Sequence, residues 1–225
     1  MSMQRTALIM AGGKGLRMGQ ALPKQFLLLD GKPVLMHTLS TFGLLKPDVR
    51  IVLVLPADQI DYWQSLCETY AFTLPHTIVQ GGHCRFDSVK NGLAAVDEAG
   101  LVAIHDGVRP LVSTALIERC YAAAATHGSA LPVTPLIESL RQVEANGNHA
   151  VDRTAYRLVQ TPQTFSAALI KQAYAQADRN DYTDDAAVYE AMGRVVHLVE
   201  GERQNIKITE GADLELAAFY LERSV

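Results

Sequence analysis

The fold of this chain is decided near its start, where the sequence reads ALIMAGGKGLRM over residues 7–18. The first four of these residues are apolar and predict a buried strand, which runs without a linker into Gly12 and Gly13. Glycine permits close backbone approaches that a Cβ would block, so exposed N–H groups in such a turn can wrap around phosphate oxygens. This start predicts a strand followed by a phosphate-binding turn, although glycine-rich turns without a ligand are also common.

Outward from this turn, short apolar runs alternate with longer amphipathic segments. The expected strands are residues 7–10, 51–55, 77–79, 101–104, 130–133 and 195–199, and the expected helices are 34–45, 59–70, 85–96, 114–126, 167–177, 184–192 and 212–221. Ser113, Thr183 and Thr209 are the expected helix N-caps. Strands that are apolar throughout and separated by helices indicate a parallel sheet covered on both faces. We therefore expect an α/β fold, with a Rossmann-like, mostly parallel sheet and helices on both faces, as one domain over residues 1–225.

One segment breaks the alternation of strands and helices. Residues 138–160 show polar alternation around Asn146-Gly147-Asn148, which is a hairpin turn signal. A hairpin inserted in an α/β sheet tends to project from the body, and such hairpins often pair with another subunit. We therefore expect a projecting β-hairpin arm over residues 138–160 that serves dimerisation.

The composition is that of an ordinary soluble globular protein, with 225 residues, 48% of them hydrophobic and 20% charged. A net charge of −4 disfavours nucleic-acid binding, which usually shows a basic surplus. No run approaches about 18 apolar residues, so the sequence predicts no membrane span. Cys67, Cys84 and Cys120 are odd in number and form no CxxC pair, which predicts free thiols and a cytoplasmic location.

Positive charge gathers beside the glycine-rich turn. Residues 1–29 contain no Asp or Glu, yet Arg5, Lys14, Arg17 and Lys24 all fall there. A mildly acidic protein with this concentration of positive charge offers a site for a small polyanion.

Two common nucleotide-binding motifs do not explain this turn. The P-loop pattern GxxxxGK[ST] is absent, and the dinucleotide pattern GxGxxG is met at Gly13 and Gly15 but fails at Met18. The acidic residue that should hold a ribose belongs at the end of the second strand, about 20 residues on. The second expected strand begins only near Ile51, so an NAD-dependent oxidoreductase is disfavoured.

The turn and the segment after it resemble the nucleotide signature of the sugar-phosphate nucleotidyltransferase superfamily, in Ala11-Gly12-Gly13-x-Gly15-x-Arg17-Met18 and Leu22-Pro23-Lys24-Gln25-Phe26. More narrowly, the chain resembles the 2-C-methyl-D-erythritol 4-phosphate cytidylyltransferase family of non-mevalonate isoprenoid biosynthesis. Further motifs follow in the same order, at residues 81–89, 105–110, 151–153, 160–163, 183–186 and 205–209. The resemblance implies an Mg²⁺-dependent enzyme that joins CTP to a sugar-alcohol phosphate and releases pyrophosphate, acting as a homodimer with shared active sites.

The chemistry of such a transfer calls for cations. A phosphate monoester is already an anion near neutral pH, so the difficulty is to bring it against the α-phosphate of a triphosphate, and neutralisation and alignment must supply the catalysis. By resemblance, the catalytic cations are Arg17, Lys24 and Lys207. The implied nucleotide-binding residues are Ala11, Gly12, Gly13, Gly15, Gly82, His83 and Ser88, with main-chain groups reading the cytosine.

Asp106 ends an apolar strand run, where open α/β sheets place their ligand crevice. A carboxylate there can hold Mg²⁺, which prefers oxygen ligands and keeps substrate phosphates as partners, and the resemblance also allows it to contact the acceptor. The simpler interpretation of Asp106 is a cap beside a helix. The remaining residues that the resemblance assigns to the acceptor are Arg109, Ser139, Arg141, Arg153, Thr161 and Thr183, with Arg153 and Thr161 resembling residues that hold its phosphate across a subunit boundary.

Two alternatives stay open at this point. The Gly12-Gly13 pair also resembles ribitol 5-phosphate cytidylyltransferases of cell-wall polymer synthesis, so ribitol phosphate is the alternative acceptor. A non-catalytic nucleotide-binding module is disfavoured, because a mere binder needs no cation on both sides of the α-phosphate. This chain has Arg17, Lys24, Asp106 and Lys207 together.

Overall fold

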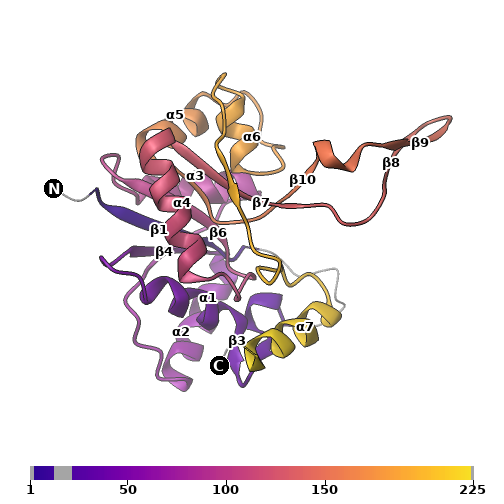
Figure 1. Cartoon of the computed structure of the whole chain (residues 1–225). Helices are drawn as coiled ribbons and strands as arrows, with labels where there is room; N and C mark the ends of the chain where they lie inside the picture. Colours follow the sequence, from indigo (N-terminus) through magenta and orange to yellow (C-terminus); the bar gives the residue numbers. More distant parts are fainter. Residues whose placement is uncertain (1–2, 13–21, 224–225) are drawn as a thin grey trace.

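The computed structural model describes residues 3–12 and 22–223. Within these residues an eight-stranded sheet has the order β10-β7-β11-β6-β1-β4-β5, with β12 also paired to β7 (Figure 1). Only β10 and β11 run antiparallel to their neighbours, so the predicted mostly parallel α/β sheet is confirmed. The strands are β1 (Arg5–Met10), β4 (Arg50–Leu55), β5 (Thr77–Gln80), β6 (Leu101–Asp106), β7 (Ser129–Pro135), β10 (Arg157–Val159), β11 (Gln163–Ser166) and β12 (Leu198–Glu200).

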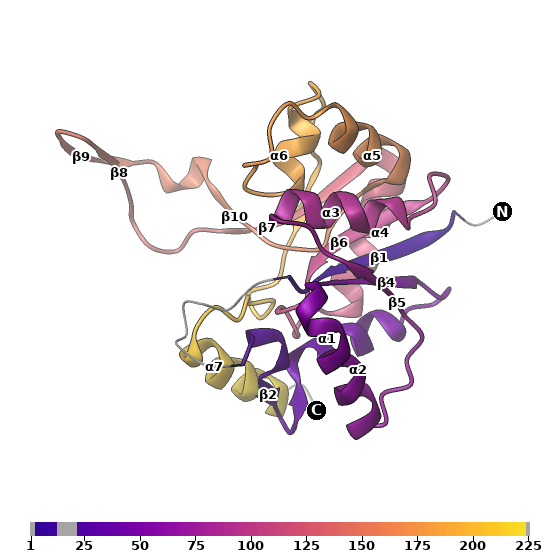
Figure 2. The same ribbon diagram turned by 180° about the vertical axis from the view of Figure 1, so that it is seen from behind.

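Helices cover both faces of this sheet because successive side chains of a strand point to opposite faces. Ala7 and Ile9 of β1 pack in one core with α1 (Val34–Gly43), α2 (Ile60–Thr69) and α4 (Thr114–His127). Leu8 and Met10 pack in the other core with α3 (Arg85–Ala94), α5 (Ala167–Gln176) and α6 (Asp185–Glu190). Figures 1 and 2 show α4 and α3 on opposite sides of β1.

A smaller core lies at one end of the molecule, beneath the last helix. There α7 (Gly211–Glu222) contributes Ala217, which packs with Leu29, Val34 and Ile208. Leu29 belongs to β2 (Leu28–Leu29), which pairs with β3 (Lys32–Pro33) in a two-stranded ribbon. This packing brings the segment before α7 against the segment that follows the glycine-rich turn.

The predicted helices lie within about two residues of the observed ones, but the sequence did not predict β10 or β11. β11 was missed because Gln163 and Thr164 are polar residues that are buried, so the strand has no apolar run. The side chain of Gln163 compensates by accepting a hydrogen bond from Ala186 N–H at 2.8 Å. β12 was placed too early, since its pairing with β7 starts at Leu198.

One of the three predicted N-caps is confirmed and two are wrong. Ser113 Oγ accepts a hydrogen bond from Leu116 N–H at 2.9 Å and caps α4. For α6 the cap is Asp184, which accepts from Ala187 N–H at 2.9 Å, and not Thr183. For α7 the cap is Glu210, in a capping box with Asp213, and not Thr209. In both cases an acidic residue one position later stands at the cap: the Asp184 carboxylate accepts from Ala187 N–H, and at α7 the Asp213 carboxylate accepts from Glu210 N–H at 2.9 Å.

The hairpin predicted within residues 138–160 is present as β8 (Leu140–Glu144) and β9 (Gly147–Val151). Figures 1 and 2 show it extending well away from the rest of the chain. Glu144 pairs with Gly147, so the turn residues are Ala145 and Asn146, one position before the Asn-Gly pair expected to form it. Residues 138–160 are called the arm from here on.

Two further expectations from the sequence concern membranes and cysteines. Among the residues that the structure describes, every helix is too short or too polar to cross a bilayer. Cys67, Cys84 and Cys120 are free, and Cys120 is a buried residue of α4.

Candidate functional site

The carboxyl ends of β1 and β6 meet at one edge of the sheet. Met10 at the end of β1 pairs with Asp106 at the end of β6, and Gly107 N–H donates to Met10 O at 2.8 Å. Thr38 Oγ1 of α1 in turn donates to Gly107 O at 3.0 Å. Asp106 therefore stands beside the start of the glycine-rich turn, as predicted. The predicted site residues Gly13, Gly15 and Arg17 lie outside the described residues.

A C-terminal segment, residues 205–209, brings two lysines to this edge. Ile208 N–H donates to Val108 O at 2.9 Å, which aligns the segment with the loop after β6. Lys207 Nζ then lies 2.9 Å from Asp106 Oδ2. Thr209 O accepts a hydrogen bond from Lys24 Nζ, at the start of the short η2 helix (Lys24–Phe26). The segment 205–209 thus carries Lys207, which contacts Asp106, and it also binds Lys24 through the carbonyl of Thr209.

Asp106 is surrounded by positive charge. Its carboxylate is 3.6 Å from Arg109 Nε, in addition to its contact with Lys207. Burial alone would raise the pKa of Asp106, but Lys207, Arg109 and Arg85 together hold the pKa below its ordinary value. Asp106 is therefore ionised at neutral pH, and the cations beside it leave the site with net positive charge.

Two cations near Asp106 have different partners. Arg85 forms a two-pronged ion pair with the wholly buried Asp185, at 2.9 Å and 2.6 Å, so its charge is largely offset. Arg109 donates from Nη1 to Asn205 O at 2.7 Å, but its buried Nε has no hydrogen-bond acceptor among the described residues. That Nε faces Asp106 Oδ2 at 3.6 Å, so the guanidinium contributes its positive charge beside the strand ends through the pair with Asp106.

The predicted cytosine pocket contains a hydroxyl that connects two glycine segments. Ser88 Oγ accepts from Gly82 N–H at 3.0 Å and donates to Cys84 O at 2.8 Å. A Cβ on Gly12 would lie 4.0 Å from the same oxygen, and one on Gly82 would lie 2.3 Å from Asp87 Cβ, so position 82 admits only glycine. His83 is exposed and lines a hollow of about 590 Å³ together with residues 80–82 and α3.

The backbone groups expected to read cytosine already have partners within the chain. Ala11 N–H donates to Val54 O at 3.0 Å, and Ala11 O accepts from Gln25 Nε2 at 2.9 Å. Gly82 N–H is engaged by Ser88. Base recognition by main-chain atoms would therefore use the second lone pair of a carbonyl or exchange one of these contacts.

The predicted acceptor residues fall into two groups. Thr161 is buried in the body, where its Oγ1 accepts from Asp106 N–H at 3.1 Å. The expectation that Thr161 acts across a subunit boundary is therefore wrong, because its side chain is held against Asp106 of its own chain. Thr183 is exposed at the residue before the cap of α6. Ser139, Arg141 and Arg153 lie on the arm, and Figure 1 shows the arm directed away from the strand ends of its own chain.

The cationic side chains of the arm make only local contacts here. Arg141 donates to Asn148 across the hairpin, and Arg153 donates from Nη1 to Ile137 O. One chain by itself therefore does not bring Arg141 or Arg153 to Asp106.

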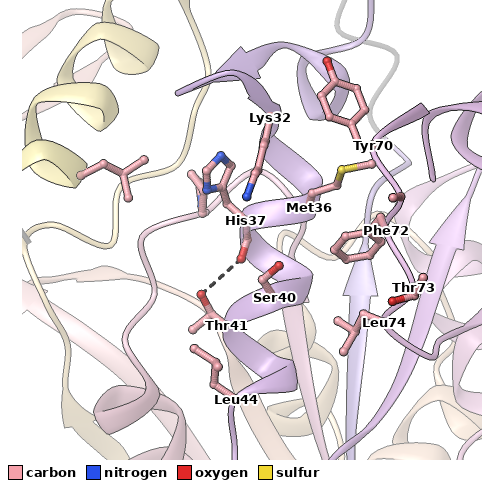
Figure 3. A pocket seen from close by; sticks show the side chains of 13 residues that line it. Lys32, Met36, His37, Ser40, Thr41, Leu44, Tyr70, Phe72, Thr73 and Leu74 are labelled. Atoms are coloured by element: carbon pink, nitrogen blue, oxygen red, sulfur yellow. Dashed lines mark hydrogen bonds between the residues drawn. The ribbon is translucent and has the colours of Figure 1, made fainter. Parts of the chain in front are cut away.

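A second hollow, of about 460 Å³, lies between α1 and the loop after α2 (Figure 3). Met36 and Phe72 line it, and Thr41 donates to His37 O at 3.2 Å in its wall. None of the predicted site residues lines this hollow. Among the described residues, Pro110 is the one lining residue that comes from the loop after β6.

Comparison with known proteins agrees with this geometry. The family model of 2-C-methyl-D-erythritol 4-phosphate cytidylyltransferase matches residues 6–223. The chain belongs to this family. A relative of that name from Bacteroides thetaiotaomicron is 52% identical over 219 residues, covering 97% of this chain and 100% of the relative. The crystal structure of the enzyme of that name from Thermus thermophilus is 33% identical, with a TM-score of 0.80, over 97% of this chain and 100% of that one.

Several residues that support this cytidylyltransferase site were not predicted. His105, Gln160 and Asn205 fall inside the quoted motifs, yet they are buried and act on the backbone rather than on a ligand. The available signal was a polar residue within a mostly apolar stretch. A polar side chain that becomes buried must be hydrogen-bonded, so such a residue is a candidate for holding the backbone in place. The role of Asp185 was also not predicted, because it is the buried partner of Arg85 and does not face a ligand.

The site fits a magnesium ion that is carried mainly by substrate. Among the described residues, no three His, Cys, Asp or Glu side chains gather closely enough to hold a metal ion. Asp106 offers one ionised carboxylate, with 13% of its side chain exposed, at the edge where phosphates are expected. Mg²⁺ commonly binds through one or two carboxylates together with substrate phosphates and water, and this donor set suits that mode rather than a resident ion.

Proposed function

We propose that this chain joins CTP to 2-C-methyl-D-erythritol 4-phosphate and releases pyrophosphate, the reaction that its family name describes. The observation that carries the proposal is the cluster at the ends of β1 and β6. There Lys207 lies 2.9 Å from Asp106, and Lys24 is tied through Thr209 to the same backbone segment. Cations from two distant parts of the chain converge on the edge of the sheet where α/β proteins bind their ligands.

The reaction forms one P–O bond and breaks another. An oxygen of the acceptor phosphate attacks the α-phosphorus of CTP, while the bond from that phosphorus to the bridging oxygen breaks and its electron pair leaves with pyrophosphate. The attacking phosphate needs no strong base, so the residues act by lowering charge repulsion and by alignment. Lys24 and Lys207 neutralise the phosphates, and the guanidinium of Arg109 supplies positive charge for the acceptor phosphate.

We also propose that Mg²⁺ accompanies the triphosphate, with Asp106 as its oxygen ligand from the protein. When bound, the ion would neutralise charge on the phosphates of CTP. Removal of Asp106 would then weaken the dependence of the rate on Mg²⁺, and so would distinguish a metal ligand from a residue that contacts only the acceptor.

The arm supports the proposal of a homodimer with shared active sites. Residues 141–150 are all exposed, and Val143 has 80% of its surface accessible. An isolated two-stranded hairpin is marginally stable in water, so it needs a surface to lie on. A twofold dimer, the commonest oligomer, would give each arm the other subunit and carry Arg153 to the partner's acceptor. We place this enzyme in the cytoplasm, where its three thiols stay reduced.

The test is direct. The purified chain is incubated with CTP, Mg²⁺ and either 2-C-methyl-D-erythritol 4-phosphate or ribitol 5-phosphate, and pyrophosphate release is measured. We expect turnover with the first acceptor and at most slow turnover with the second. A higher kcat/KM with ribitol 5-phosphate would overturn the assigned acceptor, and no pyrophosphate with either would overturn the reaction.

A further inference from the structure

His105 occupies a central place behind the proposed site. It lies one residue before Asp106, is wholly buried, and packs its ring against Phe42 with the centroids 5.2 Å apart. Its Nε2 lies 3.2 Å from Arg109 O, and its Nδ1 lies 3.0 Å from Thr161 Oγ1. The imidazole thus contacts a carbonyl of the catalytic loop on one side and a hydroxyl beside Asp106 on the other.

The partners decide where the protons lie. Arg109 O can only accept, so His105 Nε2 carries the hydrogen and donates it. A neutral imidazole then has a bare Nδ1, which must accept from the Thr161 hydroxyl. Thr161 Oγ1 remains able to accept, and it does so from Asp106 N–H at 3.1 Å.

These hydrogen bonds close a circuit through three separate parts of the chain. Thr161 O accepts from Asn205 Nδ2 at 2.8 Å. Asn205 O accepts from Arg109 Nη1 at 2.7 Å, and Arg109 O accepts from His105. His105 joins the two ends through its side chain, beside the backbone of Asp106, which donates to Thr161 Oγ1 and accepts from Arg109 N–H at 3.0 Å. The loop after β6, the segment that returns from the arm and residues 205–209 are therefore held to one another.

We propose that His105 is a positioning residue, which sets Arg109 and Asp106 against the acceptor through this circuit without touching substrate. The proposal rests on the proposed function, because Asp106 and Arg109 are assigned to the acceptor side. Loss of the circuit should let Arg109 and Asp106 move relative to each other, while the contacts of Ser88 and Gly82 on the nucleotide side stay intact. Loss of His105 should therefore raise the KM for the acceptor and leave the KM for CTP nearly unchanged.

The decisive variant is His105→Phe, which keeps an aromatic ring against Phe42 and removes both hydrogen bonds. We expect the KM for the acceptor to rise about 10-fold, in the lower range for loss of a residue that orients a ligand group, while the KM for CTP stays within about twofold. His105→Gln, whose amide can still donate to Arg109 O, should recover part of the loss. It also serves as the test if His105→Phe does not fold.

A second histidine provides a matched control. His76 accepts from the indole N–H of Trp63 at 3.0 Å, and its Nδ1 contacts Leu74 O at 2.8 Å, but it lies away from the strand ends. His76→Phe should lower the melting temperature and leave both KM values unchanged. If folded His105 variants keep the wild-type acceptor KM, or if His76→Phe changes the acceptor KM equally, the positioning role is wrong.

One measurement separates this inference from the proposed reaction. Nitrogen-15 NMR of the imidazole in the wild-type protein should show the hydrogen on Nε2 and a bare Nδ1 in the absence of any substrate. A hydrogen on Nδ1 would overturn the circuit even in an active enzyme. An inactive wild-type protein with the expected imidazole would overturn the reaction and leave the hydrogen-bond circuit standing.

Discussion

Lys207 Nζ lies 2.9 Å from Asp106 Oδ2, although the two residues are far apart in the chain. Lys207 follows β12, and Asp106 is the last residue of β6. Arg109, 3.6 Å from the same oxygen, adds a second cation. The carboxylate thus keeps both cations beside the strand ends before any ligand arrives. Because two charges surround one, the cluster retains net positive charge, which is what two phosphorylated substrates need in order to approach each other.

Lys24→Ala should lower kcat far more than it weakens CTP binding. The proposed mechanism puts its ammonium where negative charge concentrates during displacement, and loss of one such group costs about 10²–10³-fold in comparable sites. The measurement is kcat at saturating CTP, with Lys46→Ala as the control, since Lys46 is an exposed lysine that pairs with Asp48. A Lys24 variant that keeps more than about a third of wild-type kcat would contradict the role given to this residue.

CTP should be strongly preferred over UTP and ATP. The prediction assumes that main-chain atoms at Ala11 and Gly82 bound the base pocket and read the edge of cytosine. A purine should therefore not fit, and UTP presents the opposite donor and acceptor pattern at the base edge, which leaves buried groups unpaired. Competition assays that give kcat/KM for each nucleotide check this. Similar values for UTP and CTP would argue against main-chain recognition.

Asp185→Asn should destabilise the fold. The carboxylate is wholly buried, accepts from Tyr174 Oη at 2.6 Å, and pairs with Arg85. Breaking such a pair leaves a cation without its counter-charge, and we expect a loss of about 3 kcal/mol, the low end for buried pairs because Arg85 is partly exposed. Urea denaturation measures the free energy of unfolding. Asp48→Asn, which breaks the exposed pair with Lys46, should leave the free energy of unfolding nearly unchanged.

Mixed dimers should regain activity that neither parent has. If Arg153 reaches the partner's acceptor, a dimer of one Arg153→Ala subunit and one Lys24→Ala subunit has one intact site, built from the Lys24-intact body and the Arg153-intact arm. With random pairing about half of the dimers are mixed, so co-expressed subunits should reach about a quarter of wild-type activity. Differential tags confirm the mixed species. Isolated mixed dimers as inactive as their parents would show that Arg153 does not act across the subunit boundary.

Much of the fold follows from local patterns. The apolar run 7–10 and the amphipathic segment 85–96 predicted β1 and α3, because strand and helix periodicities depend on neighbouring residues. β11 escaped, because its buried Gln163 and Thr164 look like loop residues until their partners are known. Thr183 and Thr209 were wrong as caps because an adjacent acidic residue could serve equally well, and only the backbone conformation chose between them.

The sequence by itself determined the class of fold and the family, since these depend on runs of residues and on motifs in a given order. It also placed Asp106 correctly at the end of its strand. Only the tertiary structure decided which side chains meet there: Lys207 on Asp106, Lys24 on Thr209, and His105 between Thr161 and Arg109. The reason is physical. These contacts join segments far apart in the chain, and their partners are chosen by packing and by the need to satisfy buried polar groups, neither of which a local pattern contains.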